Sequence, residues 1–391
     1  MAKSVSRIRR SGEKKRLLWL IDSLTMGGAE RLVPNFARAY DKNQFELEVA
    51  CLKEIDGNPI ADDLAEMGVP VTVINSRNLR DAAAFRRLLI FIRQRGFDII
   101  HTHLTYADIW GRIAGRIIGV PVVSTLHVEQ YGGENVSAER GRAIEKLANF
   151  VRRNFGSFVI SVSDSMRRSF IEKGYRQKRL VTIHNGIDLD KFRLPADFSR
   201  IKARAGFGIP ESSSVIATVS VLREGKGHDL LLSAAERVLK TEKDVRFLIV
   251  GSGPLEARLR QRTSDAGLEN KVIFTGMRRD VVNLLALSDI FVLASERDQL
   301  PTVFLEAMAM KLPAIGLNSG GVPEMVSDGE TGIIVQSPDA RELEKGILKL
   351  LQNPETARVM GGKGRQRVEK EFSALVWAHK LQELYGKALK T

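Results

Sequence analysis

The sequence predicts an α/β protein of two doubly wound domains that face one another across a cleft. The first observation is length, since 391 residues are too many for one ordinary hydrophobic core. The second is an alternation of short apolar runs with longer amphipathic segments along the chain. The third is that this alternation lapses near Asp188–Pro210, which marks a linker. Strands that alternate with helices form parallel sheets through right-handed crossovers, so each half predicts one sheet.

The first half contains apolar runs typical of strands buried in a parallel sheet. These runs are Leu17–Ile21, Glu46–Cys51, Val71–Ile74, Ile99–His101, Val122–Thr125 and Phe158–Val162. Amphipathic segments between them predict helices, for example at Glu30–Tyr40, Ala82–Arg95, Asp108–Ile118 and Arg140–Asn154. We therefore expect a basic tail at 1–16 and a Rossmann-like domain at 17–190.

The second half repeats the pattern and predicts a second Rossmann-like domain at 191–372. Its expected strands are Val215–Val221, Arg246–Val250, Val272–Thr275, Ile290–Ala294, Ala314–Leu317 and Ile333–Val335. Residues 373–391 are amphipathic and predict a helix that crosses back to the first domain. Such sheets bind ligands at the carboxyl ends of their strands, so we expect the active site in the cleft.

Composition narrows the class of protein. The chain is 43% hydrophobic and 27% charged, which is typical of a globular protein. No apolar run approaches the roughly 18–20 residues that cross a bilayer. Leu17–Ile21 is too short for the hydrophobic region of a signal peptide. The single cysteine, Cys51, falls in a strand pattern and cannot form an internal disulfide. We therefore expect a cytoplasmic protein.

The net charge of +13 is concentrated in two segments, residues 1–16 and Arg140–Arg179. Such segments suit an anionic membrane surface, where each basic residue contributes about 1 kcal/mol. We therefore expect peripheral binding to the inner face of the plasma membrane as one interpretation, with a solvated basic surface as the other. No nucleic-acid-binding motif accompanies the charge, so nucleic acid is not the expected partner.

The segment Leu293–Pro313 carries the strongest functional pattern. An apolar strand leads into a polar turn with Asp298, and a helix is expected to begin at Pro301, where the missing N–H of proline is tolerated. Glu306 lies one helical turn further on, where its carboxylate could accept both hydroxyls of a ribose. Free N–H groups at the helix start could bind phosphate, and we expect them at Thr302, Val303 and Phe304.

Other strand-to-helix loops carry glycine pairs or cations. Gly27-Gly28 follows the first strand, but the spacing of a dinucleotide-binding fingerprint is absent. Arg223 and Lys226 lie on the loop after the first strand of the second half, where two cations could neutralise a diphosphate. A further glycine pair, Gly320-Gly321, follows a later strand of the same half.

Three histidines lie near strand ends. His127 closes a strand and is expected to open into the cleft, followed by a polar loop from Glu129 to Glu134. His101 and His103 lie at another strand end and are either acceptor-binding residues or structural imidazoles. His184 has no motif and is interpreted as incidental. The sequence contains no Cys/His cluster typical of zinc.

These motifs, taken in order, resemble glycosyltransferase family 4, whose members are retaining enzymes with the GT-B fold. The likeness covers the chain after the basic tail. It rests on the segments Gly27–Arg31, His101–His103, Ser124–His127, Asn185–Asp188, Arg223–Gly227, Asp298–Glu306 and Gly320–Glu324. It implies transfer of a hexose from a UDP-, GDP- or ADP-sugar to a saccharide or lipid-linked acceptor, in polysaccharide or glycolipid biosynthesis. It also implies that no metal ion is required, because basic side chains and helix N-termini stabilise the departing diphosphate.

The resemblance further implies roles for the two domains and for single residues. The domain at 17–190 would bind the acceptor, and the domain at 191–372 would bind the nucleotide sugar. Arg223 and Lys226 would bind the diphosphate, and Glu306 the ribose. His127 would lie beside the anomeric carbon and would be catalytic together with Arg223, Lys226 and Asp298. Met277 or Arg278 would border the nucleobase. The full set of implied donor contacts is Gly27, Gly28, Arg223, Lys226, Met277, Arg278, Asp298, Gln299, Leu300, Pro301, Thr302, Val303 and Glu306.

Two departures from the family pattern affect these expectations. Asp298-Gln299 stands where the family has Glu-Gly, and Val221 stands where many members have an arginine. They motivate a rival interpretation, a sugar-nucleotide-binding protein of the same fold without catalysis. An oxidoreductase of two such domains is the other rival, and the missing dinucleotide fingerprint argues against it.

Overall fold

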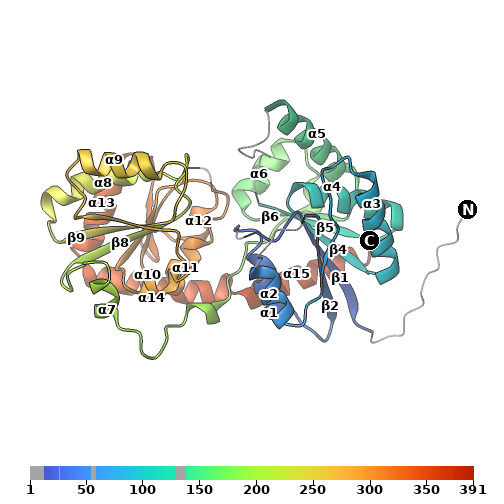
Figure 1. Ribbon diagram of the computed structural model, residues 1–391, viewed down its shortest axis with the longest axis horizontal. Helices are drawn as coiled ribbons and strands as arrows, with labels where there is room; N and C mark the ends of the chain where they lie inside the picture. The colour runs from blue at the N-terminus through green and yellow to red at the C-terminus, as the bar shows by residue number, and fades with distance from the viewer. Residues whose placement is uncertain (1–12, 26, 54–58, 128–137, 297) are drawn as a thin grey trace, which may run out of the picture. The chain divides into compact units, whose positions relative to one another are not determined.

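The computed structural model describes residues 13–25, 27–53, 59–127, 138–296 and 298–391 (Figure 1). The chain divides into two compact units. Unit 1 contains Met1–Ser161, Phe170–Ile183 and Ala378–Thr391, and unit 2 contains Val162–Ser169 and His184–Trp377. The boundaries and roles expected for the domains stay a prediction.

Unit 1 contains a parallel sheet of seven strands in the order β3-β2-β1-β4-β5-β6-β7. Its strands are β1 (Lys15–Ile21), β2 (Phe45–Cys51), β3 (Val71–Val73), β4 (Ile99–His103), β5 (Val122–Leu126), β6 (Phe158–Ser161) and β7 (Leu180–Thr182). The helices over this part of the chain are α1 (Leu32–Ala39), α2 (Pro59–Glu66), α3 (Ala82–Arg95), α4 (Thr105–Ile118), α5 (Ala138–Asn154), α6 (Asp164–Glu172) and the 3₁₀ turn η1 (Gln177–Arg179).

Successive residues of β1 pack on opposite faces of this sheet, as the two-residue period of a strand requires. Leu18 and Leu20 join the cluster that includes residues of α3 and α4. Trp19 points to the other face, where its ring lies 4.9 Å from that of Phe36 in α1. Tyr385, from α15 (Ala374–Ala388), packs against Phe36 as well. Both faces are therefore covered by helices (Figure 1).

Unit 2 contains a parallel sheet of six strands in the order β10-β9-β8-β11-β12-β13. Its strands are β8 (Ser214–Val219), β9 (Val245–Val250), β10 (Val272–Gly276), β11 (Ile290–Leu293), β12 (Ala314–Leu317) and β13 (Gly332–Val335). The helices are η2 (Leu189–Phe192), α7 (Arg200–Ala205), α8 (His228–Thr241), α9 (Glu256–Asp265), α10 (Val281–Ala286), α11 (Val303–Ala309), α12 (Val322–Met325), α13 (Ala340–Leu351) and α14 (Pro354–Glu371).

The core of unit 2 has two layers, one on each face of its sheet. Ile216 of β8 joins a cluster with residues of α8 and α13, whereas its neighbours Val215 and Ala217 join a second cluster beside α10. Two parallel sheets, each flanked by helices, confirm the expected α/β, doubly wound fold class. Their placement across a cleft stays a prediction. Strand β7 is an element that the sequence analysis missed.

Candidate functional site

The strand order of unit 2 places one crevice at the carboxyl ends of β8 and β11. From β8 the chain winds outward through β9 and β10, then returns to the other side of β8 with β11. The loops after β8 and β11 therefore leave the sheet side by side in opposite directions, which is where doubly wound sheets bind ligands. The loop after β8 carries Arg223 and Lys226, and the loop after β11 carries Asp298.

Glycines hold these two loops together. Gly225 and Gly227 have φ values of 81° and 72°, which other residues rarely adopt. The carbonyl of Gly225 accepts hydrogen bonds from the N–H of Glu296 at 3.1 Å and the hydroxyl of Ser295 at 3.0 Å. A Cβ on Gly227 would lie 1.9 Å from the carbonyl oxygen of Ala294. Any side chain at Gly227 would push the basic loop away from the acidic one.

This loop contact brings Lys226 to Asp298. The Lys226 ammonium donates to both carboxylate oxygens of Asp298, at 2.7 and 2.6 Å, and both side chains are largely buried. Arg223 is exposed on the same turn, and its guanidinium has no ion pair with a carboxylate in the described part of the chain. The two expected diphosphate cations therefore differ, since one is neutralised by an acid and the other faces solvent.

The start of α11 differs from the expected one. The helix begins at Val303, with Thr302 as its N-cap, rather than at Pro301. The N–H of Phe304 donates to the carbonyl of Pro301 at 3.0 Å, so the expectation of a free N–H at Phe304 is wrong. The cause is a tight turn that precedes the helix and uses this donor. Glu306 lies in the first turn, is half-buried, and follows Thr302 by one helical turn, as expected.

The loop after β12 closes the crevice from a third side. A Cβ on Gly320, whose φ is 53°, would lie 1.9 Å from the carbonyl oxygen of Asp298, and one on Gly321 would lie 2.2 Å from that of Gln299. This glycine pair thus packs on the backbone of the acidic loop. The side-chain Oε1 of Gln299 is buried without a hydrogen-bond partner among the described residues. Leu300 is buried beside it.

His184, interpreted from the sequence as incidental, has a defined partner. Its Nε2 lies 2.7 Å from the carboxylate of Glu324, which also accepts the backbone N–H groups of Asp164 and Ser165 at 2.7 and 2.9 Å. Burial would raise the pKa of Glu324, but these hydrogen bonds lower it below its usual value. Glu324 therefore ties together distant segments of unit 2 and caps the start of α6.

Met277 and Arg278 follow β10 at the edge of the sheet. The Met277 side chain is 81% exposed, so it is available to a flat ligand. The Arg278 guanidinium donates two hydrogen bonds of 2.8 Å to Asp280 and lies 5.8 Å from the ring centroid of Phe207. Of the two candidate nucleobase residues, Met277 is thus the one without such contacts in the described structure.

Unit 1 has an equivalent crevice, between β1 and β4. Gly27 and Gly28 lie in the loop after β1. A Cβ on Gly27 would lie 2.3 Å from Oε2 of Glu30. The other carboxylate oxygen of Glu30, Oε1, accepts a hydrogen bond of 2.6 Å from the Thr25 hydroxyl. No atom of the described residues lies within 4 Å of the position that a Cβ on Gly28 would take.

Asp22 is a residue of this crevice that the sequence analysis missed. Its carboxylate accepts the N–H groups of Ala107 and Tyr106, at 2.6 and 3.2 Å, and so caps α4. The loss of hydration inside the protein raises the pKa of Asp22 to about 7, although these hydrogen bonds and the charge of Lys53 oppose the rise. The sequence feature that could have identified Asp22 is an acidic residue directly after a buried strand and shortly before a glycine pair.

His101 fits the structural alternative. It is fully buried, its Nδ1 lies 2.6 Å from the Tyr385 hydroxyl, and its Nε2 lies 2.8 Å from the Thr125 hydroxyl. Both ring nitrogens are thus occupied. Burial lowers the pKa of His101 well below its usual value, so the ring is neutral.

His103 and His127 form a pair. Nδ1 of His103 lies 3.0 Å from Nε2 of His127, and the His103 ring stacks on Trp19 with 4.1 Å between centroids. Burial lowers the pKa of His127 to about 4. Burial, together with the neighbouring imidazoles, lowers the pKa of His103 well below its usual value. Both rings are therefore neutral, and one donates to the other. The loop Glu129–Glu134 lies outside the described residues.

The described residues show no group of three or more acidic, histidine or cysteine side chains able to hold a metal ion. The carboxylate of Asp188 accepts the N–H of Asp190 at 3.1 Å and so caps η2. The expectation that no metal is needed stays a prediction.

The two basic segments are only partly described. Residues 1–12 of the tail and the side chain of Arg140 lie outside the described residues. Arg152 lies within the second segment, but its side chain is largely buried and paired with Asp108, so it adds little to the charge of the surface. On α5, Leu147 and Phe150 are 43% and 58% exposed. Over the described ranges, no helix combines the length and apolarity needed to cross a membrane.

Comparisons with known proteins show the family of this chain. Residues 26–191 match the family described as Glycosyltransferase Family 4, and residues 199–367 match that described as Glycosyl transferases group 1. The chain is 28% identical over 317 residues to N-acetyl-alpha-D-glucosaminyl L-malate synthase of Bacillus anthracis, covering 79% of this chain and 80% of the relative. It is 25% identical over 369 residues to UDP-Gal:alpha-D-GlcNAc-diphosphoundecaprenol alpha-1,3-galactosyltransferase of Escherichia coli, covering 92% and 94%.

Solved structures show the same fold. Anabaena HepE, crystallised with UDP, superposes with a TM-score of 0.81 at 24% identity, over 95% of this chain and all of HepE (100%). TarM superposes with a TM-score of 0.75 at 13% identity, over 96% and 99% of the two chains.

Proposed function

Since the chain belongs to glycosyltransferase family 4, with the GT-B fold, we propose that it transfers a hexose from a nucleoside diphosphate sugar with retention of anomeric configuration. The acceptor is a saccharide or lipid-linked saccharide, and the product belongs to a polysaccharide or glycolipid. The observation that carries the proposal is the convergence of Arg223, Lys226 and Asp298 at one crevice, with Glu306 on the adjoining helix.

The ion pair suggests how the donor enters. A diphosphate brings its own negative charge to Lys226, which can then exchange Asp298 for phosphate oxygens. The released carboxylate of Asp298 becomes free to accept hydroxyls of the donor sugar. Arg223 is exposed and can bind the same diphosphate through its planar fork.

Two further groups complete the donor site. Glu306 accepts the ribose hydroxyls from the first turn of α11, and Thr302 and Val303 lie at the start of that helix beside the phosphate. The buried, unpartnered Oε1 of Gln299 offers an acceptor to a sugar hydroxyl. Met277 borders the base.

Catalysis is mainly electrostatic in this proposal. The two cations stabilise charge as the bond to the diphosphate breaks, which is the largest catalytic contribution in many such reactions. The acceptor attacks from the face that the diphosphate leaves, and the leaving phosphate helps to deprotonate it. His127, neutral at physiological pH, contributes a hydrogen bond beside the anomeric carbon and not a positive charge.

The donor is a UDP-, GDP- or ADP-sugar. The names of two compared proteins include UDP-Gal and UDP, which supports a UDP-sugar. A thermal-shift series with these three classes tests the proposal, because a ligand that binds only the native state raises its stability. We expect one class of nucleotide sugar to raise the melting temperature, and we expect the variant Glu306→Gln to lose this rise. No shift with any class would contradict the proposal.

A non-catalytic sugar-nucleotide binder is the second candidate, because Asp298-Gln299 departs from the family pattern. Incubation with labelled donor separates the two. Release of free sugar or transfer to an acceptor supports the enzyme, whereas binding without either supports the second candidate.

Peripheral membrane binding through the segment Arg140–Arg179 and the basic tail is a separate proposal. The exposed Leu147 and Phe150 of α5 support it, because apolar side chains among cations suit a lipid interface. Flotation with anionic but not with neutral liposomes is expected. Equal recovery with both would contradict it.

A further inference from the structure

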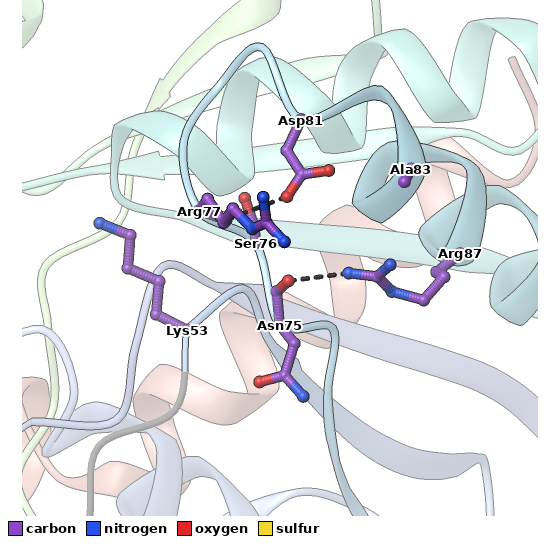
Figure 2. Close-up of a pocket in the computed structure, with 7 residues that line it drawn as sticks. All are labelled: Lys53, Asn75, Ser76, Arg77, Asp81, Ala83 and Arg87. Atoms are coloured by element: carbon purple, nitrogen blue, oxygen red, sulfur yellow. Dashed lines mark hydrogen bonds between the residues drawn. The ribbon is translucent and has the colours of Figure 1, made fainter.

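A polar cavity separate from the crevices above lies in unit 1, with a volume of about 860 Å³. It opens beside the carboxyl ends of β2 and β3 and the start of α3. Its polar lining comes from three segments: the second residue after β2, the loop after β3, and the N-cap and first turns of α3 (Figure 2). These lining residues are Lys53, Asn75, Ser76, Arg77, Asp81 and Arg87.

The cavity is positively charged, with three cations against one carboxylate among the described residues that line it. In the described structure, none of Lys53, Arg77 and Arg87 forms an ion pair with a carboxylate. The carboxylate of Asp81 accepts the backbone N–H groups of Ala84 and Arg77, at 2.9 and 3.2 Å. These hydrogen bonds lower the pKa of Asp81, which therefore stays ionised as the cap of α3.

Backbone contacts hold the lining in place. The Arg87 guanidinium donates to the carbonyl of Ile74 at 3.1 Å and to that of Asn75 at 2.8 Å. Figure 2 shows the second of these hydrogen bonds. Asn75 has a φ of 57°, which turns the chain sharply after β3. The buried Ser76 donates its N–H to the carbonyl of Leu52 at 2.7 Å. A positive cavity that is already ordered loses little entropy when an anion binds.

Lys53 and Arg77 are the adaptable groups of the cavity. Both are exposed, and Lys53 lies across the cavity from Arg87, with Arg77 between them (Figure 2). No hydrogen bond of the Arg77 side chain is recorded among the described residues. A guanidinium binds phosphate oxygens through two parallel hydrogen bonds, and an ammonium adds a point charge.

The cavity adjoins the crevice of unit 1. The N–H of Lys53 donates to the carbonyl of Asp22 at 2.9 Å, and its ammonium lies 5.6 Å from the ring centroid of Tyr106. Tyr106 in turn donates its N–H to the Asp22 carboxylate. A ligand anchored in the cavity would therefore reach the loop that carries Gly27 and Gly28.

We propose that this cavity binds a phosphate or diphosphate group carried by the acceptor, and so selects anionic acceptors. The inference rests on the proposed function, because it assigns the acceptor to the reaction of that enzyme. Its volume admits a diphosphate together with part of the group attached to it. A neutral oligosaccharide would leave the excess of three cations over one carboxylate without a counter-charge, which makes it the poorer ligand.

The test is calorimetric titration of the full chain with inorganic pyrophosphate. The titration uses an Arg223→Gln/Lys226→Gln background, so that the proposed donor cations do not bind the probe. Adding Lys53→Gln/Arg77→Gln should weaken binding at least about tenfold, since two cations that can donate charged hydrogen bonds to the phosphate oxygens are lost. The matched control Lys42→Gln/Arg86→Gln removes the same charge from exposed positions outside the cavity and should leave affinity unchanged.

Three outcomes would overturn the proposal. These are equal pyrophosphate affinity in the cavity variant and the background, an equal loss in the control, and tighter binding of malonate than of pyrophosphate. The charge-preserving variant Lys53→Arg/Arg77→Lys should keep binding, which separates loss of charge from loss of folding. Failure of the proposed function would be seen elsewhere, as absence of donor binding and hydrolysis by the unmodified chain.

Discussion

The ammonium of Lys226 bridges both carboxylate oxygens of Asp298, at 2.7 and 2.6 Å, although 72 residues separate the two in sequence. The contact joins the loops after β8 and β11 at the crevice of unit 2. It makes the candidate diphosphate site nearly neutral at Lys226 until an anion arrives. A largely buried ion pair of this kind has a large desolvation cost, so its exchange for a diphosphate is one way to couple donor binding to the release of Asp298.

Asp298→Asn should separate two roles of the carboxylate, the ion pair with Lys226 and the proposed contact with the donor sugar. The variant frees Lys226 for the diphosphate, so UDP should bind at least as tightly as before. Turnover of the donor should fall about 100-fold, because the carboxylate that contacts the sugar is lost. Calorimetry with UDP and a labelled-donor assay measure the two effects. Asp265→Asn, at an exposed position on α9, is the matched control. Loss of UDP binding would refute the exchange.

Glu306→Gln should lower donor affinity and turnover, because an amide cannot accept two ribose hydroxyls as a carboxylate does. We expect kcat/KM to fall at least about 100-fold for a lost charged contact of this kind. Glu369→Gln, a surface change on α14, should leave it unchanged. A donor with deoxyribose in place of ribose provides a second check. Because it lacks a hydroxyl that Glu306 would bind, its kcat/KM should differ little between Glu306→Gln and the natural enzyme. Near-natural rates in Glu306→Gln would remove Glu306 from the site.

Gln299→Gly should change donor preference. The natural side chain ends in a buried Oε1 without a described partner, and its removal opens space beside Leu300. The ratio of kcat/KM between two donor sugars should shift about tenfold, the scale of one hydrogen bond to a substrate. Competition between two labelled donors measures the ratio directly. An unchanged ratio would place Gln299 away from the sugar.

His127→Gln should lower kcat without changing the pH dependence of the rate between pH 6 and 8. The pKa of about 4 means that the imidazole is already neutral over this range, so it has no titration to lose. His379→Gln, exposed on α15, is the control. The disappearance of an acidic limb near pH 6 to 7 in the variant would contradict the assignment.

Asp22→Asn should flatten the pH dependence of stability between about pH 4 and 7. The pKa of Asp22 is raised from 3.8 to about 7 in the folded state, so folded protein holds a proton that unfolded protein has lost. Stability from this group is therefore present at low pH and declines as pH rises towards 7. The decline should be of the order of 2 kcal/mol after allowance for partial solvation. Denaturant titrations at pH 4.5 and 7.5 measure the decline. An equal change in the free energy of unfolding between the two pH values in both proteins would contradict the prediction.

Much of the fold could be predicted because the relevant signals are local. The apolar run Ile290–Ala294 corresponds to β11, which spans Ile290–Leu293. Strand β7 was missed because Leu180–Thr182 is short and only partly buried, so its pattern resembles that of a loop. The start of α11 was placed at Pro301 because proline favours a first helical turn, but Phe304 uses Pro301 as acceptor in a tighter turn.

The sequence could predict which residues belong to the candidate site, but not how they contact one another. Motif order brought Arg223, Lys226 and Asp298 together as candidates, but no local rule shows which cation meets which acid. Asp22 was missed because its shifted pKa depends on burial beneath α4, and that contact comes from residues far along the chain.

Local patterns in the chain were enough to place most of its elements, the two sheets and the glycine pairs, since apolar period and backbone sterics act over a few residues. Tertiary structure alone decided that Lys226 is paired while Arg223 is exposed, that His101 has both nitrogens occupied, and that Lys53, Arg77 and Arg87 line one cavity. The reason is that charge interactions and desolvation depend on distances of a few ångströms between residues that sequence separation does not specify.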